Sequence, residues 1–341
     1  MKTLILLLVM VCAPLSVRAQ VSASTSAEGV VATTAVVTAS ATAAVQGGAS
    51  TSTSRPALAS AIENAEVGNK VLLRIESARG LRALDRAEFF SAKCGCYRAG
   101  SPTNPNYDAS APGPGPGQAT NSNYMQMVLR GEFAVTGRAA LVGELPLRQF
   151  SPQTFIGTPY DGASGLSDIR FGTKLDLSHD SNSQMTLELL ASAPTGDESK
   201  GLGTGHWTVL PTVLYNTRLG DRVTLETHVG SVVPMKGATG VLGGSQYFSG
   251  RMMTFGLAPT FDAYTRGNLH VAPIVEMVGW RILDGYSTYD NASAKGTTIV
   301  NLNVGARVVR GVHSVYVGYA KALTDKTWFD NAVRIELRRG F

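Results

Sequence analysis

The sequence predicts an all-β protein, a transmembrane antiparallel β-barrel of 12 strands. Long segments alternate apolar and polar residues with a period of two, as strands do. The connections between these segments alternate between short and long, which is the asymmetry of outer-membrane barrels. Beyond the first 19 residues, no apolar run reaches the length of a spanning helix, about 20 residues. A membrane protein with this sequence therefore has to cross the bilayer with strands.

The amino terminus has the pattern of a secretory signal peptide over residues 1–19. Lys2 precedes an apolar core from Leu4 to Leu15, and the small residue Ala19 stands before the predicted cleavage site. The sequence therefore predicts export and, together with the barrel pattern, a location in the bacterial outer membrane.

Three further segments follow the signal peptide. Residues 20–60 are almost wholly Ala, Ser, Thr, Val and Gly, a composition that buries too little apolar surface to fold, so we predict a flexible linker. Residues 61–86 have a mixed pattern that suits a short helix or irregular cover. We assign them to the periplasm without a role, and we expect the barrel over residues 87–341.

Cysteine usage and net charge narrow the function. In an oxidising compartment Cys94 and Cys96 are candidates for a disulfide, whereas two thiols alone cannot complete the tetrahedral shell of a metal site. The formal charge is +5, of which Lys2 and Arg18 lie in the signal peptide. The remaining excess is too small to indicate nucleic-acid binding, and nothing in the sequence calls for a cofactor.

The strands are assigned from their alternation, which is clearest between Gly165 and Asp221. There Ile169 and Phe171 share one face of a strand, while Arg170 and Lys174 share the other. The alternation is poorest in the first predicted strand. In chain order the strands are expected at about 84–97, 123–134, 138–149, three within 165–221, 222–234, 251–264, 268–282, 297–309, 313–323 and 329–341.

The connections also alternate in length, and we expect the longer ones outside the cell. The loops at 98–122 and 235–250 are candidate lids over the barrel. Short turns are expected near 135–138, 178–183, 218–222, 265–268 and 310–313, and longer loops near 98–122, 150–165, 195–204, 235–250, 283–296 and 324–328.

The last strand ends the chain on Phe341. It resembles the closing strand of outer-membrane barrels, in which a terminal aromatic residue serves as an assembly signal. The resemblance implies that the barrel-assembly machinery is a partner, alongside outer-membrane lipid and a small-molecule solute.

One face of each predicted strand is apolar and the other is charged. The strands are about 11–14 residues long, whereas soluble strands average about 5–6, which favours a barrel with lipid outside and a wet lumen. Charges of both signs alternate on the inward face, which indicates cross-strand ion pairs. The candidate lumen-lining residues are Arg130, Glu132, Glu144, Asp168, Arg170, Lys174, Glu188, Glu226, His228, Glu276, Arg307, Arg334 and Glu336.

Aromatic residues gather near the ends of strands that lead to the longer loops. They suit a girdle at the membrane interface, although Trp280 has the inward parity. The other residues of this predicted girdle are Trp207, Trp328, Tyr160, Tyr247, Phe248, Tyr286, Tyr289 and Phe329.

A sequence motif links this chain to a known family. The strand GLSDIRFGTKLDL, followed by LLASAPTGDESKGLGTGHW, resembles the bacterial outer-membrane family described as putative components of the meta pathway of phenol degradation. The resemblance covers about residues 123–341 and implies a transporter-like barrel for aromatic or other hydrophobic small molecules. Its motif residues here are Gly165, Leu166, Asp168, Pro194, Thr195, Gly196, Asp197, Gly203, Gly205 and Trp207.

A second segment, His179-Asp180-Ser181-Asn182, resembles the active-site segment of outer-membrane phospholipase A, in which a His, a Ser and an Asn act together. It departs from that pattern, because no Gly-Arg follows Asn182 and the next strand supplies no Asn to orient His179. The segment also falls at a predicted periplasmic turn, so we interpret it as a polar turn and expect no enzyme.

The sequence therefore predicts an outer-membrane channel for the passive uptake of small hydrophobic or aromatic solutes. A 12-stranded ring encloses a narrow space, since eight strands are filled by side chains and 16–18 leave an open channel. A structural or adhesin-type barrel and a lipid hydrolase are the alternatives.

Overall fold

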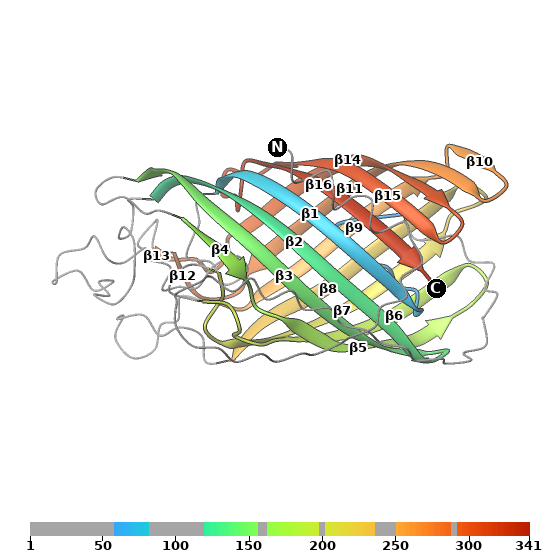
Figure 1. Cartoon of the computed structure of the whole chain (residues 1–341), viewed down its shortest axis with the longest axis horizontal. Helices are drawn as coiled ribbons and strands as arrows, with labels where there is room; N and C mark the ends of the chain where they lie inside the picture. The colour runs from blue at the N-terminus through green and yellow to red at the C-terminus, as the bar shows by residue number, and fades with distance from the viewer. Residues whose placement is uncertain (1–57, 82–118, 156–161, 198–201, 236–249, 288–291) are drawn as a thin grey trace, which may run out of the picture. The chain divides into compact units, whose positions relative to one another are not determined.

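The computed structural model describes residues 58–81, 119–155, 162–197, 202–235, 250–287 and 292–341 (Figure 1). The chain divides after residue 52, and all the described residues belong to the second part, Thr53–Phe341. None of the described residues forms a helix that is long and apolar enough to span a membrane.

Strands of the described part form a closed antiparallel ring of 12 (Figure 1). Successive strands of the ring pair with each other, and β1 closes it by pairing with β16. The predicted fold class is therefore confirmed. The ring consists of β1 (Lys70–Leu81), β2 (Ala119–Thr136), β3 (Ala139–Phe155), β5 (Arg170–His179), β6 (Ser183–Ser192), β7 (Trp207–Arg218), β8 (Val223–Met235), β9 (Met252–Phe261), β11 (Leu269–Ile282), β14 (Thr298–Arg310), β15 (His313–Ala322) and β16 (Asn331–Gly340).

Four shorter strands lie outside the ring of 12. β4 (Ala163–Leu166) extends the pairing of β3 where β5 has not yet begun, and β10 (Tyr264–Arg266) pairs with the start of β11. β12 (Tyr286–Ser287) and β13 (Ala292–Ser293) pair with each other in the connection between β11 and β14.

The two ends of the barrel differ in their connections. Short turns join β2 to β3, β5 to β6, β7 to β8 and β14 to β15, and the β9–β11 turn carries β10. The longer connections lie at the other end, as predicted. The start of β1 and the end of β16 share the short-turn end, where Lys70 pairs with Gly340.

The outward face of the ring is apolar on every strand. Branched and aromatic side chains that would be buried in a soluble protein are exposed along the strands, as a lipid-facing belt requires. One such residue from each strand, in ring order, is Val71, Leu129, Leu141, Phe171, Leu189, Val213, Val229, Leu257, Val275, Val304, Val317 and Ile335.

The first barrel strand differs from the prediction. The barrel begins with β1 at Lys70, so the predicted start at residue 87 is wrong, and the predicted strand at 84–97 lies outside the described residues. The prediction missed this strand because of Leu72, an apolar residue on its inward face. Leu72 lines a small space with Glu63 and Asn64 and so faces protein rather than water. An apolar residue at an inward position weakens the alternation on which the prediction depended.

A second correction concerns the residues just before β1. Residues 58–69, here called the lumenal segment, lie inside the ring and not in a separate periplasmic segment. Leu58, Ala59 and Ser60 are buried against barrel strands, so the linker predicted over 20–60 ends before Leu58. The sequence around Leu58 gave no sign of this because its partners lie far along the chain.

Candidate functional site

The inside of the barrel has two walls of different character. The six adjacent strands β16, β1, β2, β3, β5 and β6 form what we call the charged wall, and β7, β8, β9, β11, β14 and β15 form the neutral wall. The inward charges of the neutral wall are Glu226, Glu276 and Arg307, together with Arg218, which has the inward parity at the short-turn end of β7. Those of the charged wall are Lys70, Arg74, Glu76, Arg130, Glu132, Glu144, Arg148, Arg170, Lys174, Asp176, Glu188, Arg334, Glu336 and Arg338.

Ion pairs connect the strands of the charged wall, both neighbours and strands farther apart in the ring. Arg130 lies 2.6 Å from Glu144 and also binds Glu188, so one guanidinium holds two buried carboxylates. Lys174 lies 3.1 Å from Glu132, and both side chains are fully buried. Since a buried charge without a partner is costly, these pairs keep the wall in one arrangement.

The charged wall also holds the second half of the lumenal segment. Arg74 lies 2.7 Å from Glu63. The hydroxyl of Thr186 donates to the carbonyl of Ala65 at 2.6 Å, and Lys174 donates to that of Glu66 at 3.1 Å. Residues 63–66 are therefore tied to this wall.

The neutral wall uses its few charges to hold the first half of the lumenal segment. Glu226 accepts the backbone N–H groups of Leu58 and Ala59 at 2.8 and 3.0 Å, and Glu276 accepts those of Ser60 and, at 2.9 Å, Ala61. The guanidinium of Arg307 donates to the carbonyls of Leu58 and Ala59 at 2.6 and 2.9 Å. These bonds satisfy six backbone groups of the segment, which would otherwise be buried in the lumen without partners.

Apolar contacts complete this attachment. The side chain of Leu58 packs with Ala272, Ile274, Val309 and Tyr316. Ile62 packs with Ala258 and Val278, and Trp280 borders the same cluster. Ala272, Ile274, Val309 and Tyr316 thus face protein rather than water, whereas Val278 and Trp280 also line a cavity.

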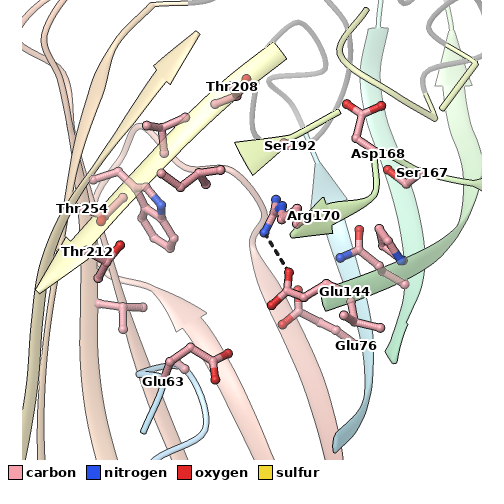
Figure 2. A pocket seen from close by; sticks show the side chains of 18 of the residues that line it. Glu63, Glu76, Glu144, Ser167, Asp168, Arg170, Ser192, Thr208, Thr212 and Thr254 are labelled. Atoms are coloured by element: carbon pink, nitrogen blue, oxygen red, sulfur yellow. Dashed lines mark ion pairs between the residues drawn. The ribbon is translucent and has the colours of Figure 1, made fainter. Parts of the chain in front are cut away.

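A cavity of about 330 Å³ lies inside the ring with Ala61 and Glu63 of the lumenal segment in its lining. Figure 2 shows Arg170, Glu144 and Glu76 on one side of it and Thr208, Thr212 and Thr254 on the other, with Glu63 on the loop between. Its volume is within the range of small-molecule sites, about 300–1,000 Å³.

The 13 predicted lumen-lining residues divide into two groups. One group lines the cavity: Glu144, Asp168, Arg170, Glu188, His228 and Arg334. The other group lies outside the cavity, in the ion pairs of the charged wall or against the lumenal segment: Arg130, Glu132, Lys174, Glu226, Glu276, Arg307 and Glu336. All 13 lie within the barrel, and the cavity brings six of them together.

Sequence reasoning missed most of the uncharged lining of the cavity. Leu210, Leu214, Val232 and Val278 have the inward parity of their strands, but only their position in the ring shows that they line a space. Thr208 Oγ1, Asn301 Oδ1 and His228 Nδ1 have no hydrogen-bond partner within the described part of the chain. All three residues line the cavity, although these atoms themselves are buried.

The aromatic residues only partly form the predicted girdle. Trp207 is exposed on the outside and packs edge-to-face on Phe171, with ring centroids 6.1 Å apart. Trp328 and Phe329, however, are buried, and Trp328 packs on the cavity residue Trp280 at 6.3 Å. Their predicted place in a lipid-facing girdle is therefore wrong, because the β15–β16 connection turns them inward. Tyr160, Tyr247, Phe248 and Tyr289 lie outside the described residues, and the side chain of Tyr286 is not described.

The motif that carries the family resemblance forms a loop clasp. The carboxylate of Asp168 accepts the backbone N–H of Gly196 at 3.0 Å and both the N–H and the hydroxyl of Thr204 at 2.7 Å. Gly203 is needed because a Cβ there would lie 2.5 Å from the Asp168 carboxylate and 2.6 Å from the Gly196 carbonyl. The clasp joins the start of β5 to the β6–β7 connection at the long-loop end of the cavity.

The segment His179-Asp180-Ser181-Asn182 is a turn between β5 and β6. Nδ1 of His179 lies 2.5 Å from Asp176, and Asp180 accepts the N–H groups of Asn182 and Ser183 at 2.7 Å. The Asn182 N–H, together with Ser183, holds the pKa of Asp180 below its ordinary value. These contacts shape the turn, as the sequence predicted.

The candidate disulfide pair Cys94 and Cys96 lies outside the described residues. In the part of the chain that the structure describes, no group of three or more His, Cys, Asp or Glu side chains is placed to hold a metal ion.

Residues 118–240 match the family described as putative MetA-pathway of phenol degradation. The resemblance predicted from the sequence is confirmed. The match includes the Asp168 clasp and most of the charged wall's cavity residues. No curated protein matches the chain.

The chain is similar to several solved structures. The COG4313 outer membrane channel from Pseudomonas putida F1 is 15% identical, with a TM-score of 0.50 over 81% of this chain and 96% of that one. A Pseudomonas aeruginosa FadL homologue is 10% identical, with a TM-score of 0.39 over 80% and 90%. LpxR from Salmonella typhimurium is 11% identical, with a TM-score of 0.42 over 80% and 100%. The first of these shows that the fold is that of bacterial outer-membrane barrels.

Proposed function

We propose that this protein is an outer-membrane channel through which small, hydrophobic or aromatic solutes enter the cell by passive diffusion. The observation that carries the proposal is the cavity inside a lipid-facing ring, with Trp280, Val278 and Leu214 in its lining. A cavity of about 330 Å³ accommodates a small organic molecule, and its apolar lining favours one with an apolar body.

The orientation of the barrel follows from its two ends. Short turns face the periplasm in barrels of this class and longer loops face outward, so the clasp at Asp168 lies on the outer side of the cavity and the lumenal segment on the inner side. A solute that passes inward must therefore displace or pass the lumenal segment. We further propose export by the signal peptide over residues 1–19, and assembly through the carboxyl-terminal strand that ends on Phe341.

Uptake of the neutral aromatic dye N-phenyl-1-naphthylamine tests the proposal. An intact outer membrane excludes this dye, so a porin-deficient Gram-negative host that expresses the full chain should take it up faster than a host with an empty vector. Thr254→Trp, which fills the cavity from β9, should abolish the gain.

Two controls accompany the dye experiment. The band shift between boiled and unboiled protein reports a folded barrel, and exclusion of a large antibiotic shows that the membrane is otherwise intact. Dye uptake at the empty-vector rate by a folded, membrane-inserted barrel contradicts the proposal.

A further inference from the structure

The cavity has a polar and an apolar side. On the apolar side Trp280, Val278 and Leu214 come from the neutral wall, and Phe329 lies in the β15–β16 connection. On the polar side are Arg148 and Arg170 from β3 and β5. A solute that fills the cavity therefore meets hydrocarbon and rings at one side and guanidinium groups at the other.

The carboxylates that line the cavity already have cationic or N–H partners. Glu144 lies 2.6 Å from Arg130, and Glu188 binds the same guanidinium. Glu76 binds Arg334 and accepts the hydroxyl proton of Tyr124 at 2.5 Å. Glu63 pairs with Arg74, and Asp168 is held by the clasp. A cationic solute would therefore have to break an existing pair to gain a counter-ion.

Arg170, the cavity arginine from β5, is held less closely. Nη1 of Arg170 lies 3.6 Å from Glu144, a carboxylate that Arg130 binds a full ångström closer, and its side chain remains 37% exposed. Nε and Nη2 of Arg148 both donate to one neutral acceptor, Gln126 Oε1, at 2.9 and 2.7 Å. A guanidinium prefers a bidentate, charged acceptor, and a carboxylate in the cavity would supply one to Arg170.

We propose that the cavity binds amphipathic organic acids, with the carboxylate at Arg170 beside Arg148 and the apolar or aromatic body against Trp280 and Val278. This inference rests on the proposed function and narrows its substrate class from hydrophobic solutes in general to hydrophobic acids. Arg170 binds the charged end of the solute. The neutral wall contacts the apolar body and accepts bodies of different shapes.

A matched pair of aromatic probes tests this preference. 4-Nitrobenzoate and 4-nitrobenzamide have nearly the same size and both quench tryptophan fluorescence, but only the first carries a charge at pH 7. Binding is measured by quenching in lipid nanodiscs that contain the full chain, and Trp280→Phe identifies the signal that comes from the cavity. We expect the acid to bind about tenfold more tightly than the amide, since a hydrogen bond to a charged group contributes about that factor or more.

Variants at Arg170 test the assignment of the charged contact. Arg170→Gln should weaken binding of the acid about tenfold and leave that of the amide unchanged, and Arg170→Lys should restore part of the preference. Arg310→Gln removes the same charge at the exposed short-turn end of β14 and should change neither probe. If Arg170→Gln lacks the heat-dependent gel shift of a folded barrel, Arg148→Gln is measured in its place.

Three outcomes overturn the inference and leave the proposed function standing, each in a barrel that still takes up the neutral dye. They are equal binding of the two probes, tighter binding of the amide, and no binding of either probe. A barrel that fails the dye experiment removes the proposed function instead. The two failures are thereby distinguishable.

Discussion

The charged and neutral walls solve the same problem, how to fill a narrow ring, in opposite ways. The charged wall fills its half with ion pairs such as Lys174–Glu132, in which side chains of β5 and β2 satisfy each other across the intervening β3. The neutral wall presents small and apolar residues, and a separate stretch of the chain, the lumenal segment, packs on them. One wall therefore depends on pairs within the ring, and the other depends on a segment that could in principle leave it.

The largest expected effect comes from breaking the charged wall. Arg130→Met leaves the buried carboxylates of Glu144 and Glu188 without their shared partner, and loss of one member of a buried pair costs about 3–5 kcal/mol. We expect the free energy of unfolding in lipid vesicles, measured by urea titration, to fall by that amount.

A control for this variant lies on the same wall. Arg138 is 61% exposed and lies 3.8 Å from Asp176, so Arg138→Met should cost at most about 1 kcal/mol. Equal losses for the two variants would mean that the charged wall is wetter than its burial indicates.

A substitution in the neutral wall should release the lumenal segment more than it destabilises the ring. Glu226→Leu removes the acceptor of the Leu58 and Ala59 N–H groups, and each hydrogen bond to a charged group contributes about 1.5–3 kcal/mol. Since the segment can satisfy its N–H groups with water once released, we expect higher single-channel conductance in planar bilayers and faster cleavage near Leu58 by protease, while the ring stays folded.

A different result for Glu226→Leu would change the comparison between the two walls. Unchanged conductance together with a lower free energy of unfolding would show that the lumenal segment and the ring unfold as one unit, and that the neutral wall depends on the segment as much as the segment depends on the wall.

A smaller effect is expected from adding one methyl group on the neutral wall. A Cβ at Gly256 would lie 2.6 Å from the His228 ring and 3.0 Å from Ile62 of the lumenal segment, and such overpacking typically costs about 1–3 kcal/mol. Gly256→Ala should therefore lower the unfolding midpoint in urea. Gly131→Ala is the control, because a Cβ there meets nothing within 4 Å, and a loss at Gly131 as large as at Gly256 would refute the explanation.

The two walls also differ in how far the sequence predicts them. On β5 and β6 the outward residues Phe171 and Leu189 alternate with the inward charges Lys174 and Glu188, so the contrast between faces gives both the strands and their orientation. The ring of 12 strands, its two unlike ends and the inward charges follow from this contrast. On β11 the inward Ile274 and Val278 resemble the outward Val275 and Met277, so nothing local shows that the inward pair faces a cavity or a segment.

The lumenal segment illustrates the limit of local reasoning. Its hydrogen bonds connect residues 168 positions apart, from Leu58 to Glu226, and 216 apart, from Ser60 to Glu276. No periodicity within residues 58–69 encodes these partners. For the same reason the prediction missed the first strand, because its inward residue Leu72 has Glu63 and Asn64 as neighbours. The position of both depends on contacts across the closed ring, and only the three-dimensional structure shows these contacts.

The long separation of these contacts has a consequence for how the molecule is made. Leu58 and Ser60 are synthesised before any strand of the ring. Their hydrogen-bond partners Glu226, Glu276 and Arg307 lie in the later two thirds of the ring sequence. Since contacts between distant parts of a chain require closure of a long loop first, we expect the lumenal segment to bind inside the barrel only after the ring of strands has closed.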